Sequence, residues 1–168
     1  MIDAFGELRA AQPAAAVPLA LALLLFAVNG ARLAWIDART HLLPNRIVFP
    51  WYPAALTLLG ASAAIAGDWG ALIRLVLAGA ALFAFYLVLH LIQPGGMGLG
   101  DVKLAGILGM YLGFLTWEHL LLGTLATFVV GGAYGLAMIL ARRATRKSSI
   151  PFGPFMILGT AAALVVAG

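Results

Sequence analysis

Cysteine is absent from the chain, and charged residues of either sign are scarce. Without cysteine the chain can build neither a disulfide framework nor a thiolate zinc site, and it has no cysteine nucleophile. Charged residues make up 10% of the sequence, against about 25% in soluble domains. Hydrophobic residues make up 64%, which identifies an integral membrane protein with little mass outside the bilayer. The net charge of +4 does not indicate nucleic-acid binding, because the basic residues lie at the ends of apolar runs.

Six apolar runs divide the chain. The runs are continuous and do not alternate apolar with polar residues, which favours helices over the strands of a closed barrel. We therefore expect an all-α polytopic membrane protein of about six transmembrane helices, forming a single membrane-embedded domain over residues 1–168. The fourth and sixth runs are short and are interrupted by glycine or proline. The expected spans are residues 13–35, 47–67, 71–92, 102–115, 119–141 and 150–166.

Basic residues cluster around the first, third and fifth connections, and only Arg9 and Arg74 fall on the other side. Because positive residues are retained on the cytoplasmic side of a membrane, we expect these three connections in the cytoplasm and both termini outside. Asp37, in an expected loop over residues 36–46, and Asp101, where the fourth run begins, are then the only acidic residues on that face. The topology allows these two connections to meet.

The third connection is rich in glycine and ends on an aspartate, with the sequence GGMGLGD at residues 95–101. Such a backbone can turn tightly and lie close to another chain, so Gly98 and Gly100 are candidate contacts for an extended peptide substrate. Two carboxylates that share one proton can hydrolyse an amide, because the ionised one activates a water and the protonated one supplies the leaving nitrogen with a proton. Asp37 and Asp101 are the candidate pair, and Lys103 is a candidate for attracting the substrate or lipid headgroups.

Simpler roles exist for most of these residues. Asp101 could cap a helix, a role that is compatible with catalysis. Asp37 could be a solvated loop carboxylate paired with Arg32 or Arg39. Helix packing is the favoured role for the glycines at positions 106, 109 and 113. The three histidines do not show a metal-ligand spacing, and no serine has a histidine and an acid arranged to activate it.

The sequence around both aspartates resembles a known family. GLGDVKL at residues 98–104 resembles the GxGD motif of membrane aspartic proteases, in the fuller form of the type IV prepilin peptidases. Asp37 with LLPN at residues 42–45 resembles the first catalytic aspartate of that family and its downstream Pro-Asp or Pro-Asn. IPFGP at residues 150–154 is similar to the Pro-Phe-Gly-Pro segment of its last helix. Presenilin-type GxGD proteases fit less well, since these contexts are not their signature.

The resemblance implies an aspartic endopeptidase with Asp37 and Asp101 as its catalytic dyad. Its substrate would be a prepilin or pseudopilin, whose short basic leader is cut after a glycine at the cytoplasmic face of the inner (plasma) membrane. Pro44 and Asn45 are then further candidates for substrate binding, although shaping a turn is the simpler role for both.

The same resemblance implies a second activity, methylation of the new N-terminus with S-adenosylmethionine, whereas cleavage itself needs no cofactor. Long family members carry a cysteine-rich zinc module, so this cysteine-free chain resembles the short, catalytic-core form. The expected partners are the peptide substrate and membrane lipids, with no nucleic acid. Two other classes remain as alternatives: a small proton-coupled transporter, and a non-catalytic assembly factor for a pilus or secretion system.

Overall fold

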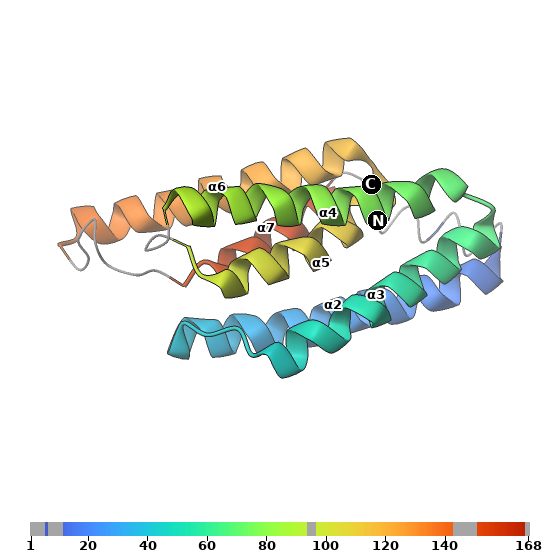
Figure 1. Ribbon diagram of the computed structural model, residues 1–168, viewed down its shortest axis with the longest axis horizontal. Helices are drawn as coiled ribbons and strands as arrows, with labels where there is room; N and C mark the ends of the chain where they lie inside the picture. Colours follow the sequence, from blue (N-terminus) through green and yellow to red (C-terminus); the bar gives the residue numbers. More distant parts are fainter. Residues whose placement is uncertain (1–5, 7–11, 94–96, 143–150, 167–168) are drawn as a thin grey trace.

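The computed structural model describes residues 6, 12–93, 97–142 and 151–166. Six helices make up most of these residues, no strand occurs among them, and the helices run roughly along one common axis (Figure 1). The expected all-α architecture is therefore confirmed. The helices are α2 (Pro13–Thr40), α3 (Asn45–Ala66), α4 (Trp69–Ile92), α5 (Leu99–Leu115), α6 (Trp117–Leu140) and α7 (Gly153–Val166).

Four of the helices, α2, α3, α4 and α6, are long and apolar enough to cross a membrane. Their outward faces carry exposed leucine, isoleucine and valine side chains, among them Leu24, Ile73 and Leu121. A water-soluble protein would not expose so many large apolar groups, whereas a lipid bilayer accommodates them. The chain is accordingly a polytopic membrane protein.

The shorter helices α5 and α7 lie among the longer ones (Figure 1). Twelve of the 17 residues of α5 are buried, so this helix faces protein on nearly every side. It packs closely against α4: a Cβ atom placed on Gly109 would lie 2.6 Å from the carbonyl oxygen of Ala78 and 3.0 Å from the Cα of Gly79. Helix packing, the role favoured for the glycines of this helix, is confirmed at this position.

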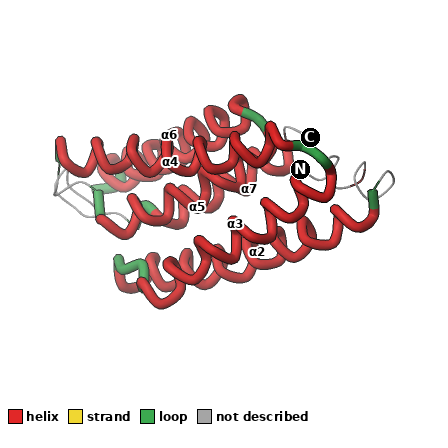
Figure 2. The backbone as a smooth tube through the Cα atoms, turned by 45° about the vertical axis from the view of Figure 1, so that its right-hand side comes forward, coloured by secondary structure: helices red, strands yellow, loops and turns green. Residues whose placement is uncertain are grey.

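Helices α2 and α3 form a pair along one side of the other four (Figures 1 and 2). A buried chain of hydrogen bonds joins this pair to α5: the indole Nε1 of Trp51 donates to the hydroxyl of Tyr111 at 3.1 Å, and that hydroxyl donates to the carbonyl of Ala22 at 2.9 Å. The ring of Phe26 packs against both aromatic rings. The hydroxyl of Tyr52 forms a second link between α3 and α5, because it donates to the backbone carbonyl of Lys103 at 2.5 Å. These contacts fix the position of the α2–α3 pair against α5.

Some expected segments fall outside the described residues. Positions 94–96, which include Gly95 and Gly96 of the glycine-rich stretch, are among them, as is most of the basic cluster after α6. The described part of the third connection runs from Met97 into α5. Here the Nδ1 atom of His90 at the end of α4 donates to the carbonyl of Met97 at 2.8 Å, which ties the approach to α5 against the preceding helix.

Candidate active site

Asp37 lies in the last turns of α2, on the buried face of the helix. The expected loop over residues 36–46 is shorter than predicted, because α2 continues to Thr40 and only residues 41–44 connect it to α3. The helix ends where His41 adopts a left-handed conformation, with φ of 53°, and donates its amide to the carbonyl of Asp37. The Asp37 side chain is only 4% exposed.

The carboxylate of Asp37 is held by the last helix of the chain. Its Oδ2 atom accepts the backbone N–H of Gly153 at 3.0 Å. Gly153 is the first residue of α7, where amides lack an intrahelical partner and the helix dipole favours a negative charge. Arg39 instead lies over the ring of Trp35 at 3.9 Å. The alternative of a solvated loop carboxylate at position 37 is therefore wrong.

Asp101 is the third residue of α5, and its side chain is 8% exposed. Its Oδ2 atom accepts the N–H of Gly98 at 3.2 Å. Gly98 is itself the N-cap residue, with extended backbone angles, so Asp101 supports the helix start from inside the first turn and is not the N-cap that one alternative suggested. Like Asp37, it combines a backbone amide with the positive end of a helix dipole.

The carboxylates of Asp37 and Asp101 lie within electrostatic range of each other, although one belongs to α2 and the other to α5. Each has one oxygen held by a backbone amide. The other oxygen of each has no hydrogen-bond partner among the described residues. Every fully buried side-chain nitrogen or oxygen in that part of the chain does have a partner, so these two oxygens are not fully buried. These second oxygens therefore remain accessible from outside, as the activation of a water molecule requires.

Gly100 brings the connection after α2 against the start of α5. A Cβ atom on Gly100 would lie 2.9 Å from the Cβ of Leu43, so the close approach requires glycine here. At Gly98 an added Cβ would lie 3.4 Å from Asp101 Oδ2 and 3.8 Å from the amide nitrogen of Gly100, both ordinary contact distances. The expectation that the first and third connections meet is thus confirmed, and the steric need for glycine in the motif is at position 100.

Lys103 and Asn45 meet on the edge of this region. The Nζ atom of Lys103 donates to Asn45 Oδ1 at 3.1 Å and lies 5.2 Å from the centre of the Phe49 ring. Pro44 is the N-cap of α3, and its carbonyl accepts the amide of Val48 at 3.1 Å. Pro44 therefore caps the start of α3. The hydrogen bond between Asn45 and Lys103 joins α3 to α5, two residues beyond Asp101 in the sequence.

Two residues of the site were not assigned from the sequence. Tyr86 of α4 is buried, interacts electrostatically with Asp101, and packs against the rings of Phe128 and Phe152. Nothing in its surroundings along α4 distinguishes it from the other apolar residues of that helix. Gly153 belongs to the IPFGP segment, but its contact with Asp37 spans 116 positions. In the described part of the chain, no three histidine, cysteine, aspartate or glutamate residues cluster in a way that could hold a metal ion.

Comparisons with known proteins identify relatives of this chain. The model of the type IV leader peptidase family matches residues 16–136. A prepilin leader peptidase/N-methyltransferase of Burkholderia pseudomallei (strain K96243) is 34% identical over 166 residues, which cover 96% of this chain and 52% of the relative. Proteins of the same name from Stutzerimonas stutzeri and Bacillus subtilis are each 32% identical, over 86% and 74% of this chain and 49% and 47% of their own lengths.

No solved structure gives a significant match. The chain spans about half the length of the curated relatives it matches. The matched region extends over most of the sequence and contains both Asp37 and Asp101. This chain belongs to the type IV leader peptidase family.

Proposed function

We propose that this protein is an aspartic endopeptidase that cleaves the short basic leader of a prepilin or pseudopilin after a glycine, with Asp37 and Asp101 as its catalytic dyad. The observation that carries the proposal is the pairing of two buried carboxylates within electrostatic range, each with one oxygen held and one accessible. Membership of the family adds the substrate class, because the relatives are named prepilin leader peptidases.

The chemistry follows from two acidic groups that lie within electrostatic range of each other. Such a pair keeps one carboxyl neutral while the other is ionised, and it gains and loses protons as a unit. The ionised member removes a proton from a water that attacks the scissile carbonyl, and the neutral member donates its proton to the leaving nitrogen. The amides of Gly153 and Gly98 orient the two groups during both transfers.

The substrate would lie across the two connections beside the dyad. Residues 97–100 and 41–44 pack against each other there through Gly100 and Leu43. We assign Gly98 and Gly100 to the backbone contact with the extended leader, and Pro44, Asn45 and Lys103 to the neighbouring edge. All of these positions lie at the helix ends where Asp37 and Asp101 are found.

The same argument gives the setting of the enzyme. Residues 1–168 would form a single multi-pass domain of the inner (plasma) membrane, with the dyad facing the cytoplasm, because the basic residues gather at this end. Cleavage would require no cofactor, since two carboxylates and water complete the reaction. S-adenosylmethionine would serve only a separate methyl transfer, and adding it should leave the rate of cleavage unchanged.

The test is a cleavage assay in liposomes with a substrate that carries a basic leader, a glycine and a hydrophobic helix. Wild type and Glu118→Gln, a control that removes an exposed acid at the start of α6, should both cleave after the glycine, as read by mass spectrometry. Asp37→Asn and Asp101→Asn should insert normally and leave the leader intact. Full activity of either dyad variant would refute the assignment. A folded wild type that cleaves no substrate in a panel would favour the transporter or assembly factor.

A further inference from the structure

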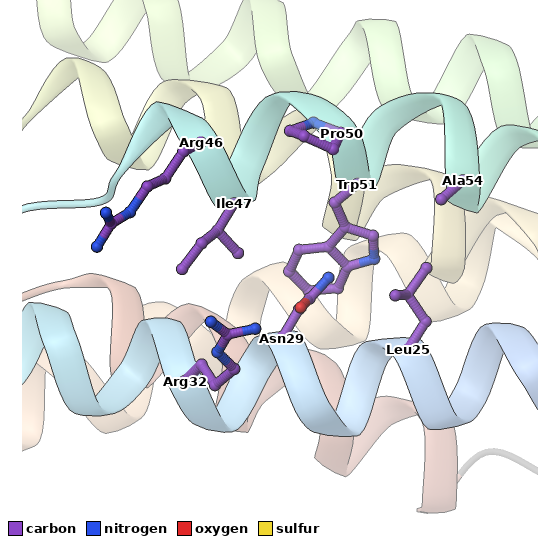
Figure 3. Close-up of a pocket in the computed structure, with 8 residues that line it drawn as sticks. All are labelled: Leu25, Asn29, Arg32, Arg46, Ile47, Pro50, Trp51 and Ala54. Carbon is purple, nitrogen blue, oxygen red and sulfur yellow. The ribbon is translucent and has the colours of Figure 1, made fainter.

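A cleft of about 360 Å³ lies between α2 and α3, apart from the proposed dyad. Leu25, Asn29 and Arg32 share one face of α2, being spaced four and three residues apart. Figure 3 shows Asn29 and Arg32 pointing from α2 toward α3, while Ile47 and Trp51 point back from α3. The carboxylate of Asp37 is directed elsewhere, toward α7.

The mouth of the cleft is positively charged, and no acidic residue of the described part of the chain lines it. Arg32 and Arg46 line it together with no acidic residue, and within the described chain neither makes a hydrogen bond or ion pair. Two other cations of the fold have partners: Lys103 donates to Asn45, and Arg74 donates to the carbonyls of Gly113 and Phe114. Two guanidinium groups that face one cleft without a partner form a site for an anion.

The positions of Arg32 and Arg46 along their helices place both residues at the membrane interface. Arg32 is one turn from Trp35, whose side chain is 61% exposed, and exposed tryptophans concentrate at the boundary between lipid and water. Arg46 is in the first turn of α3, beside the connection from α2. A group bound between the two arginines would therefore lie at the depth of the lipid headgroups.

Below this mouth the cleft becomes apolar. Leu25 and Ala54 lie two turns further along their helices, roughly 10–12 Å away at 1.5 Å per residue, and Trp51 and Pro50 line the cleft beside them. The half-buried amide of Asn29 lies between the charged and apolar parts. This gradient from cationic to apolar fits a molecule with an anionic head and a hydrocarbon tail.

We propose that the cleft between α2 and α3 binds one anionic phospholipid from the leaflet at this end of the helices. The phosphate lies between the guanidinium groups of Arg32 and Arg46, the amide of Asn29 donates to an oxygen of the glycerol esters, and an acyl chain follows the apolar part. Basic clefts between membrane helices commonly hold anionic headgroups.

Other occupants fit the cleft less well. A basic leader peptide would be repelled by the arginines. An acidic peptide would match their charge but would place its backbone amides against Leu25 and Ala54, where they would lack hydrogen-bond partners. A free phosphate would use the mouth and leave the apolar part without a role.

The test measures lipid retention by native mass spectrometry of the full chain in detergent, and it does not depend on peptidase activity. Phosphatidylglycerol and phosphatidylcholine with identical acyl chains are compared, with glycerol 3-phosphate as a soluble headgroup. Wild type should retain one phosphatidylglycerol in preference to phosphatidylcholine. Arg32→Gln/Arg46→Gln should bind it about tenfold or more weakly.

The matched control is Arg39→Gln/Arg142→Gln, which removes the same charge from the same end of the helices but leaves the cleft intact; it should bind as wild type does. Ala54→Phe fills the apolar part without changing the charge and should also weaken lipid binding, which keeps the proposal testable if the double arginine variant does not fold. Equal retention of the two lipids, or equal loss in the control, would overturn the proposal. So would binding of glycerol 3-phosphate or of an acidic peptide as tight as that of the lipid.

Discussion

Gly153 offers the sharpest test of how the fold prepares Asp37. In Gly153→Ala the new Cβ would lie 2.8 Å from Asp37 Oδ2 and 3.3 Å from its Cγ, so the carboxylate has to move away. The backbone amide of residue 153 would still be present, but the 3.0 Å hydrogen bond to Asp37 could not keep its geometry. The variant therefore displaces the carboxylate without removing any titratable group.

The size of the effect follows from that hydrogen bond. A bond to a charged group contributes about 1.5–3 kcal/mol. If Asp37 depends on it in the transition state, kcat/KM should fall roughly 10- to 150-fold, at about 1.4 kcal/mol for each factor of ten. Because the amide orients the catalytic group and does not bind the leader, the loss should appear in kcat, with KM nearly unchanged.

The assay is the rate of leader cleavage over a range of substrate concentrations, with thermal unfolding measured on the same samples. Gly132→Ala is the matched control, since a Cβ on Gly132 of α6 meets nothing within 4 Å; it should cleave as wild type does. Wild-type kcat in a folded Gly153→Ala protein would refute the view that α7 positions Asp37.

The other predictions concern packing and the edge of the site. Gly109→Ala should lower the free energy of unfolding by about 1–3 kcal/mol, because its Cβ would overlap a carbonyl of α4; a thermal midpoint equal to that of wild type would contradict this. Tyr111→Phe should cost about 1–3 kcal/mol in thermal unfolding, since it leaves the buried carbonyl of Ala22 and the indole N–H of Trp51 without their partner, and an unchanged stability would count against the buried network. Lys103→Met removes a hydrogen bond to Asn45 and a contact of the ammonium group with the Phe49 ring, both at the protein surface, so kcat/KM should change by less than about fivefold; a complete loss of cleavage would give Lys103 a larger role than the structure supports.

Several features follow from local sequence alone. Run length and a charged fraction of 10% are sufficient to predict helices in a membrane. Counting the runs places the helix ends that carry Asp37 and Asp101 on one side, and glycines spaced three and four apart indicate a close helix contact at Gly109. Each of these inferences depends on residues near one another in the chain, or on a simple alternation of sides.

Only the tertiary structure decided which groups meet. The amide of Gly153 on the Asp37 carboxylate, the burial of Tyr86 near Asp101, and the lining of one cleft by both Arg32 and Arg46 all depend on how each helix is rotated about its axis. In a soluble protein the apolar stripe of a helix reveals that rotation. In a membrane protein the lipid-facing and core-facing sides are both apolar, so the pattern along one helix does not show which side is buried, and the contacts between helices determine it.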